Sequence, residues 1–88
     1  FYGTVPLARM LTAAEVAADY EHQTGVVIVQ RFRELGLDPL AMPAVLQAGH
    51  APFTFGKSPM DSVKNSIALE MCAQMALDAL RLHPALEA

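Results

Sequence analysis

Hydrophobic and polar residues follow two long helical patterns in this chain, with a short extended region between them. The first pattern begins at Thr12, which has the spacing to Glu15 of a capping box, in which each side chain accepts a hydrogen bond from the other residue's backbone amide. Apolar or small residues then recur every three or four positions. We predict a helix with one continuous apolar face, ended by Gly36 and by Asp38-Pro39. The residues of this face are Val16, Tyr20, Thr24, Ile28, Phe32 and Leu35.

The middle of this helix has a second interpretation. Gly25 costs about 1 kcal/mol in a helix relative to alanine. The β-branched residues from Val26 to Val29 would also suit a strand. We keep the helix because the helical spacing continues through this segment.

Three short extended segments complete the first two thirds of the chain. Residues 1–11 have the pattern of a strand and its exit, which Pro6 restricts to the edge or the end of a sheet. The run from Ala44 to Gly49 is short, apolar and bounded by breakers, as a buried strand is. Phe53 and Phe55 alternate with Thr54, which indicates another extended piece.

A second long helix is predicted from Ser58, the cap, with Pro59 in the first turn and Asp61 near the positive end of the helix dipole. Its apolar residues surround much of the cylinder, so we expect the helix to be covered on more than one side. The methionines are most simply core filler, and Cys72 is expected to be a packed, inert thiol. The main apolar stripe consists of Met60, Val63, Ile67, Met71 and Met75.

Composition and charge exclude several classes of protein. The 88 residues are 53% hydrophobic and have a net charge of -3 without blocks of one sign. Neither a basic nucleic-acid stripe nor a polybasic membrane anchor is present, and a membrane span needs about 18 consecutive apolar residues. We predict a soluble chain without nucleic-acid or membrane partners. A single cysteine fits a reducing compartment such as the cytoplasm.

His50 is the clearest candidate for a residue that takes part in chemistry. Pro52 lacks an amide, so the preceding strand is expected to end near His50 and to present the imidazole at the rim of a sheet. Spacing alone favours a buried, hydrogen-bonded histidine over a metal ligand. Catalytic zinc usually takes three protein ligands and an open position. Because the chain has no HxH, HxxxH or CxxC pair, it cannot complete such a site alone.

The remaining polar candidates have simpler interpretations. Glu21 is most simply a solvated carboxylate, His22 a member of the same surface cluster, and His83 an exposed residue near the end of the chain. Residues 51–58 have the pattern A-x-x-x-x-G-K-S, one residue away from a phosphate-binding loop. Pro52 removes an amide from this segment and two phenylalanines place bulky rings in it, which argues against a nucleotide site.

The chain resembles the second half of the family of class II aldolases and L-ribulose-5-phosphate 4-epimerases. The most specific stretch is Met42 to Lys57, where the family typically has His-Gly-Pro-Phe followed by aromatic-Gly-Lys. Ala51 replaces the usual glycine and Phe55 stands where tryptophan is common, and neither change removes a metal-binding atom. The matching residues are Phe1-Tyr2-Gly3, Val5-Pro6, Arg9, Leu11-Thr12, Glu15, Tyr20-Glu21, Thr24-Gly25, Val27-Ile28, Met42-Pro43, Val45-Leu46, Gly49-His50, Pro52-Phe53 and Gly56-Lys57.

The resemblance implies that residues 1–88 are part of a class II aldolase domain, supplying late strands and helices of a three-layer α/β/α fold in a homotetramer. It implies that His50 joins an upstream histidine pair in binding a divalent metal, most often zinc, and that Glu21 lies near the substrate. It also implies that the remaining catalytic residues lie before Phe1 and after Ala88. The chain begins without methionine or a signal pattern, so we expect it to begin inside a longer one.

The activity that the resemblance implies is the interconversion of L-ribulose 5-phosphate and D-xylulose 5-phosphate. It proceeds by retro-aldol cleavage of the sugar phosphate, rotation of the aldehyde fragment and re-addition, with the metal as a Lewis acid. Two alternatives stay open. One is an aldolase acting on another ketose phosphate, and the other is a non-catalytic module that keeps the fold for assembly.

Overall fold

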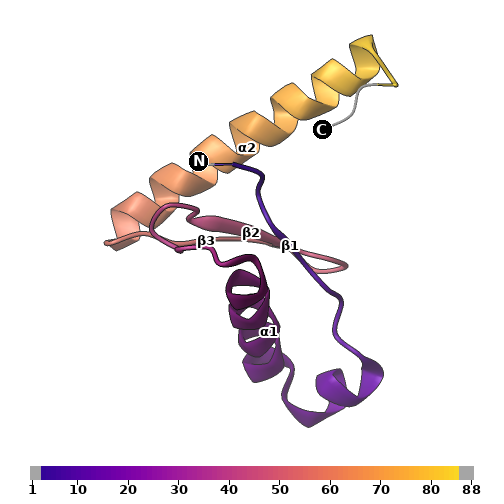
Figure 1. Cartoon of the computed structure of the whole chain (residues 1–88), viewed down its shortest axis with the longest axis vertical. Helices are drawn as coiled ribbons and strands as arrows, with labels where there is room; N and C mark the ends of the chain where they lie inside the picture. Colours follow the sequence, from indigo (N-terminus) through magenta and orange to yellow (C-terminus); the bar gives the residue numbers. More distant parts are fainter. Residues whose placement is uncertain (1–2, 86–88) are drawn as a thin grey trace.

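The computed structural model describes residues 3–85, so Phe1 and Tyr2 of the first predicted strand lie outside the described residues. Two helices and a small sheet make the chain α/β, as predicted. Figure 1 shows the sheet between the two helices, with α1 on one side and α2 on the other. The elements are β1 (Leu7–Ala8), α1 (Ala13–Leu35), β2 (Ala44–Gln47), β3 (Pro52–Thr54) and α2 (Pro59–Leu82).

The strands form one mixed sheet in the order β1-β2-β3. β1 pairs with β2 in parallel and β3 pairs with β2 antiparallel, with Val45 opposite Phe53. The buried strand predicted from Ala44 is confirmed as far as Gln47. A tight turn follows, in which the His50 amide donates to the Gln47 carbonyl at 3.1 Å. Gly49 has φ 73° in this turn, as the third residue of a type II turn requires.

α1 begins with the predicted capping box. The Glu15 amide donates to Thr12 Oγ1 at 3.2 Å, and the Thr12 amide donates to Glu15 Oε1 at 2.9 Å. Gly36 ends the helix in the left-handed conformation, with φ 64°. The segment after Gly25 is helical, so the strand interpretation of residues 26–29 is wrong.

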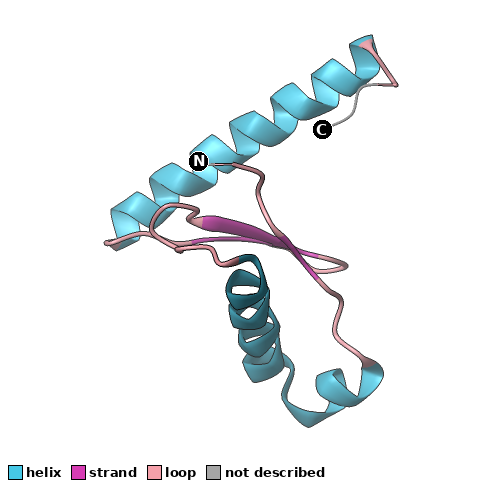
Figure 2. Ribbon diagram, in the orientation of Figure 1, coloured by secondary structure: helices cyan, strands magenta, loops and turns pink. Residues whose placement is uncertain are grey.

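The predicted continuous face of α1 is also wrong, because Asp19 has the non-helical angles φ -167° and ψ 94°. The helix therefore consists of two pieces joined at an angle, which Figure 2 shows at its lower right. The His22 amide donates to Asp19 Oδ1 at 3.3 Å, so Asp19 caps the second piece. Val16 and Tyr20 stay more than 40% exposed, whereas Thr24 and the later face residues Ile28 and Phe32 are buried.

The core lies between the second piece of α1 and the sheet. The Phe32 and Phe55 rings meet edge to face with their centroids 5.7 Å apart. Arg31 Nε donates to the Leu7 carbonyl at 3.0 Å and ties α1 to β1. The buried cluster consists of Ala8, Val27, Ile28, Phe32, Met42 and Val45.

α2 is fixed to the sheet by its first turns. Its cap is the predicted Ser58, whose Oγ accepts from the Asp61 amide at 3.2 Å. Thr54 and Ser62 exchange two hydrogen bonds of 3.1 Å, each hydroxyl donating to the other residue's carbonyl. A Cβ on Gly56 would lie 2.6 Å from Asp61 Cβ, so only glycine allows the loop to approach α2 this closely.

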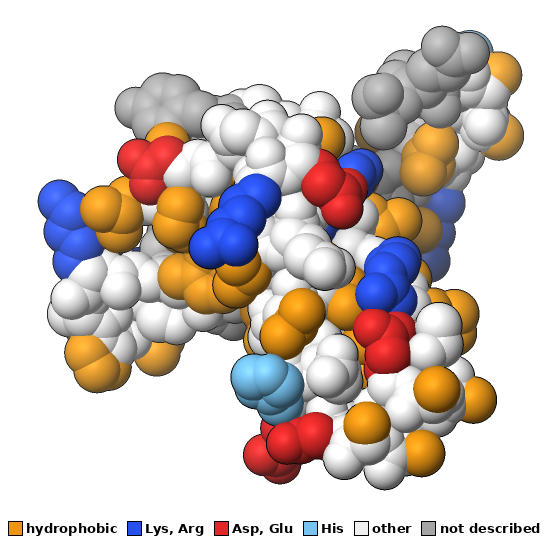
Figure 3. Space-filling view, turned by 60° about the horizontal axis from the view of Figure 1, so that its bottom comes forward, with side chains coloured by type: hydrophobic (Ala, Val, Ile, Leu, Met, Phe, Trp, Pro, Cys, Tyr) orange, Lys and Arg blue, Asp and Glu red, His pale blue; other side chains and the backbone are white. Residues whose placement is uncertain are grey.

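The expectation that α2 is covered on more than one side is wrong for this chain. Leu69 is buried, but the predicted core methionine Met71 is 60% exposed and Cys72 is exposed rather than packed. The second half of α2 extends past the sheet (Figure 1), and hydrophobic side chains lie along this projecting arm at the upper right of Figure 3. Within residues 3–85, neither helix combines the length and hydropathy that crossing a membrane requires.

Candidate metal-binding site

His50 lies in the turn between β2 and β3, at one end of the sheet, with its side chain exposed. The predicted place of His50 at the rim of the sheet is confirmed, but the reason given for it is wrong, because β2 ends at Gln47 and Pro52 begins β3 opposite Leu46. The alternative of a buried histidine is wrong for this chain. The Tyr20 ring meets the imidazole edge-on, with centroids 5.4 Å apart, and the Phe53 ring does so at 5.6 Å. These two rings restrict how the imidazole can turn.

A hollow of about 130 Å³ lies beside His50. The turn after β2, the segment after β1 and the start of α1 all contribute to it. Gln47 is 5% exposed, and within residues 3–85 no group donates a hydrogen bond to its buried Oε1. The accessible imidazole of His50 and the largely buried Gln47 thus line the same hollow. Its lining residues are Met10, Leu11, Val16, Tyr20, Gln47, Ala48, Gly49 and His50.

An ion pair holds the wall of this hollow in place. Arg9 donates to both carboxylate oxygens of Glu15, at 2.7 and 2.9 Å, and so fixes the first piece of α1 to the segment after β1. These hydrogen bonds, with a further one from the Thr12 amide, lower the pKa of Glu15 to about 2. The same pairing raises the pKa of Arg9. The bend at Asp19 then brings α1 back toward the turn, where Tyr20 meets His50.

The imidazole of His50 is a suitable ligand for a divalent metal. Across residues 3–85, however, no three His, Cys, Asp or Glu side chains are grouped so that they could hold a metal together. The described residues therefore fit a metal as the source of one ligand.

Glu21 lies next to Tyr20 on α1 but does not line the hollow beside His50. Its side chain is exposed and borders a separate, shallow depression together with His22 and Arg33. The surface position predicted for His22 is confirmed. His83 is exposed as well and forms the C-terminal cap of α2.

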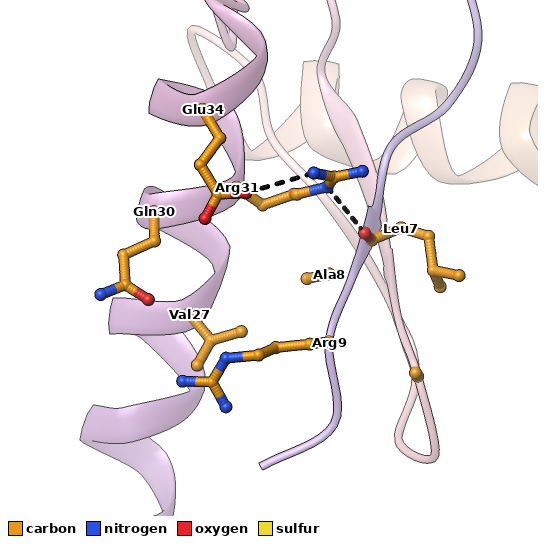
Figure 4. Close-up of a pocket in the computed structure, with 8 residues that line it drawn as sticks. Leu7, Ala8, Arg9, Val27, Gln30, Arg31 and Glu34 are labelled. Carbon is orange, nitrogen blue, oxygen red and sulfur yellow. Dashed lines mark hydrogen bonds and ion pairs between the residues drawn. The ribbon is translucent and has the colours of Figure 1, made fainter.

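A second cleft, of about 270 Å³, lies between β1 and α1 and contains neither His50 nor Glu21. Figure 4 shows Arg31 extending from α1 across this cleft to the Leu7 carbonyl. Arg31 also pairs with Glu34 at 3.2 Å, while Arg9 pairs with Glu15. Both guanidinium groups are already paired with carboxylates, so the cleft has little to attract an anion.

Two features of the site were not predicted from the sequence pattern. Gln47 is the only polar side chain from Ala44 to Gly49, and strand alternation places it on the same buried face as Val45. Asp19 stands three residues before His22, which is the spacing of a helix cap. The apolar periodicity on either side of Asp19 concealed that signal.

The sequence matches a known family along most of its length. Residues 1–77 match the family described as the Class II Aldolase and Adducin N-terminal domain. The chain belongs to this family, as the resemblance predicted. Its more similar relatives carry the name L-ribulose-5-phosphate 4-epimerase UlaF: those of Salmonella paratyphi B and Salmonella paratyphi C are 38% identical to it over 86 residues, and that of Salmonella typhi is 37% identical.

The alignments with these relatives cover 98% of this chain and 37% of each relative. The chain thus spans little more than a third of the length of the relatives it matches.

Proposed function

We propose that this chain is part of a metal-dependent sugar-phosphate epimerase that interconverts L-ribulose 5-phosphate and D-xylulose 5-phosphate. The main support is the exposed imidazole of His50 at a strand end, in a chain similar along 98% of its length to L-ribulose-5-phosphate 4-epimerases. The class II aldolase family generally uses a divalent metal. Here His50 supplies one ligand, and the metal is zinc. When bound, it supplies Lewis-acid chemistry to the oxygens of the ketose phosphate.

The residues around His50 have separate tasks in this proposal. Tyr20 and Phe53 hold the imidazole between their rings, so that its orientation is set before a metal arrives. Glu21, the next residue on α1, contacts the substrate from outside the hollow as a supporting carboxylate. Its exposure supports this role, because an exposed carboxylate can accept hydrogen bonds from sugar hydroxyls.

The proposal also covers the rest of the domain, its assembly and its compartment. The complete domain has three α/β/α layers, forms a homotetramer and works in the cytoplasm, and the other metal ligands come from outside residues 3–85. The placement of the helices on opposite sides of the sheet supports the layering (Figure 1). The exposed stripe of α2 supports a larger domain, since an apolar surface of this kind is usually covered.

The proposal is tested by assaying the interconversion of the two sugar phosphates with the longest natural chain that contains these residues. The His50→Ala variant should lose more than about 100-fold in kcat/KM, more than disturbing a metal's outer shell costs. His83→Ala is the matched control and should keep its activity, because His83 is exposed and lines neither the hollow beside His50 nor the depression beside Glu21.

The assay also separates the alternatives. Cleavage of another ketose phosphate, without epimerisation, would assign the chain to an aldolase. The second candidate, a non-catalytic assembly module, draws support from the lack of a complete metal-binding group within residues 3–85. A wild-type protein with neither metal nor activity would favour that module.

A further inference from the structure

The side chain of Met10 lies against the turn that carries His50. Gly49, the residue before His50, has φ 73°, and a Cβ added to it would lie 2.5 Å from Met10 Cε and 3.5 Å from Met10 Sδ. The end of the Met10 side chain therefore rests on the Gly49 backbone, where no larger residue would leave room for it. This contact restricts the movement of the turn on that side.

The same side chain is open to solvent. Met10 is 63% exposed, whereas Met42 in the core is 1% exposed. Met10 also lines the hollow of about 130 Å³ beside His50, so a chemical change in its thioether takes place within the site. Exposed methionine thioethers are oxidised reversibly to sulfoxides. Met10 thus joins an oxidisable group to the backbone that positions the candidate metal ligand.

We propose that Met10 is an oxidation site that controls how firmly the chain holds His50. Hydrogen peroxide transfers one oxygen to Met10 Sδ, so that the peroxide O–O bond breaks and an S–O bond forms. The sulfur is oxidised by two electrons. The other peroxide oxygen takes the proton of the transferred oxygen and leaves as water. The product, methionine sulfoxide, is polar and is returned to methionine by dedicated reductases.

The new oxygen weakens the contact between Met10 and Gly49. A polar group costs free energy in an apolar contact unless it is hydrogen-bonded, so the S–O group turns toward water and takes the side chain with it. The turn then loses its support on that side, and the imidazole of His50 is held less firmly. The effect on a bound metal rests on the proposed function, whereas the effect on the turn does not.

NMR of the metal-free protein measures the contact directly, in the longest natural chain that contains these residues. Before oxidation, a nuclear Overhauser effect should join the Met10 methyl group to the Gly49 α protons. With added peroxide this effect should disappear and the amide signals of Gly49 and His50 should shift. Both changes should follow the fraction of Met10 sulfoxide that mass spectrometry of peptides measures.

Two results in the wild type alone would overturn the proposal, so it does not depend on how well any variant folds. One is a Met10 that is fully oxidised while the signals of Gly49 and His50 stay unchanged. The other is a Met10 that stays reduced in peroxide that oxidises free methionine.

Met10→Leu separates this sulfur from the other oxidisable groups. Leucine has a similar volume and forms no sulfoxide, so peroxide should leave the signals of Gly49 and His50 in place. Met71→Leu is the matched control and should respond like the wild type, because Met71 is 60% exposed on α2 and does not line the hollow. Both variants keep Cys72, so oxidation of the thiol affects them alike. Equal responses in Met10→Leu and the wild type would contradict the proposal.

Zinc affinity gives a second reading, taken by competition with a chelator before and after peroxide. Zn²⁺ binding should weaken at least about 10-fold in the wild type and in Met71→Leu, the lower end of the usual cost of disturbing the surroundings of a metal ligand. Met10→Leu should keep its own starting affinity. If oxidised wild type binds Zn²⁺ as tightly as before, the control of metal binding fails and the proposed function stands. If the wild type binds none, the proposed function fails and the NMR signals still decide the role of Met10.

Discussion

Glu15 closes the capping box of α1 and also binds Arg9. The capping box was predictable because its two members lie three residues apart in the sequence. The pairing with Arg9 was not, since it depends on how the segment after β1 bends back toward the helix. The same carboxylate accepts hydrogen bonds from Arg9 and from the Thr12 amide. A substitution of Arg9 should therefore weaken the capping of α1.

Replacing Arg9 by glutamine tests this pairing at the residue scale. Without the guanidinium, the pKa of Glu15 should rise from about 2 toward its ordinary value of 4.5. NMR titration of the Glu15 carboxyl carbon measures the change. Arg81→Gln is the control, because Arg81 pairs with Asp78 on the other helix. A Glu15 titration that is the same in Arg9→Gln and the wild type would disprove the pairing.

The direction of the pH dependence follows from the same pKa. Folding lowers the pKa of Glu15, so the carboxylate stabilises the folded chain above its unfolded pKa of about 4.5 and loses that contribution as the pH falls toward about 2. The helical content of the first piece of α1 should therefore fall across this window. In Glu15→Gln that part of the change should be absent, as circular dichroism at each pH would show.

The residues around His50 differed in how far they could be predicted. Its place after the buried strand was predictable from the apolar run that ends at Gly49, although Pro52 pairs with Leu46 rather than ending the sheet. The contact with Tyr20 depends on the bend in α1 and has no local signal. Gln47 had a local signal, because it is a polar residue on a buried strand face. The hollow that it lines could not be predicted from the sequence.

At the scale of elements, the ends of the helices were predictable and the bend in α1 was not. Thr12, Gly36 and Ser58 all lie where their capping chemistry indicates. Asp19 can either continue a helix or cap a new one, and periodicity alone does not decide between these. In the structure it caps the second piece through the His22 amide. The first piece can then pair with Arg9 through Glu15 instead of packing against the core.

Asp19→Ala should remove the cap and favour a straight helix, because alanine is the best helix former. We expect a loss of about 1 kcal/mol in stability, partly offset by helix propensity. The Tyr20 ring should then move away from His50, which the nuclear Overhauser effects between the two rings would report. Asp19→Asn keeps a capping oxygen and should preserve them. Unchanged ring contacts in Asp19→Ala would contradict this account of the bend.

At the scale of the whole molecule, α2 shows the limit of pattern analysis. Its apolar stripe predicted burial, yet Ile67 is 58% exposed and Met75 61%. The radius of gyration is 14.3 Å, against about 12 Å for a compact domain of this length. A hydrophobic pattern indicates that a surface needs a partner and does not say whether the same 88 residues provide it. The α/β class was therefore predictable, and the packing of α2 was not.

Ile67→Glu tests whether the stripe of α2 is covered in a larger domain. In the 88-residue segment the change should alter stability by less than about 0.5 kcal/mol, because the site is exposed. In the longest natural chain it should destabilise by about 3 kcal/mol or more, since a charge would be buried. Ser66→Glu, also exposed in this chain, is the control. Equal melting shifts for Ile67→Glu in the two chains would contradict the prediction.

The central claim is that His50 binds a divalent metal, and the most direct test is the metal content of the purified protein. The longest natural chain, the His50→Ala variant and the His22→Ala control would be measured by mass spectrometry of the elements after identical dialysis. We predict about one zinc per chain in the wild type and in His22→Ala, and a large loss in His50→Ala. A wild type without metal, or a His50→Ala variant that retains all of it, would contradict the account.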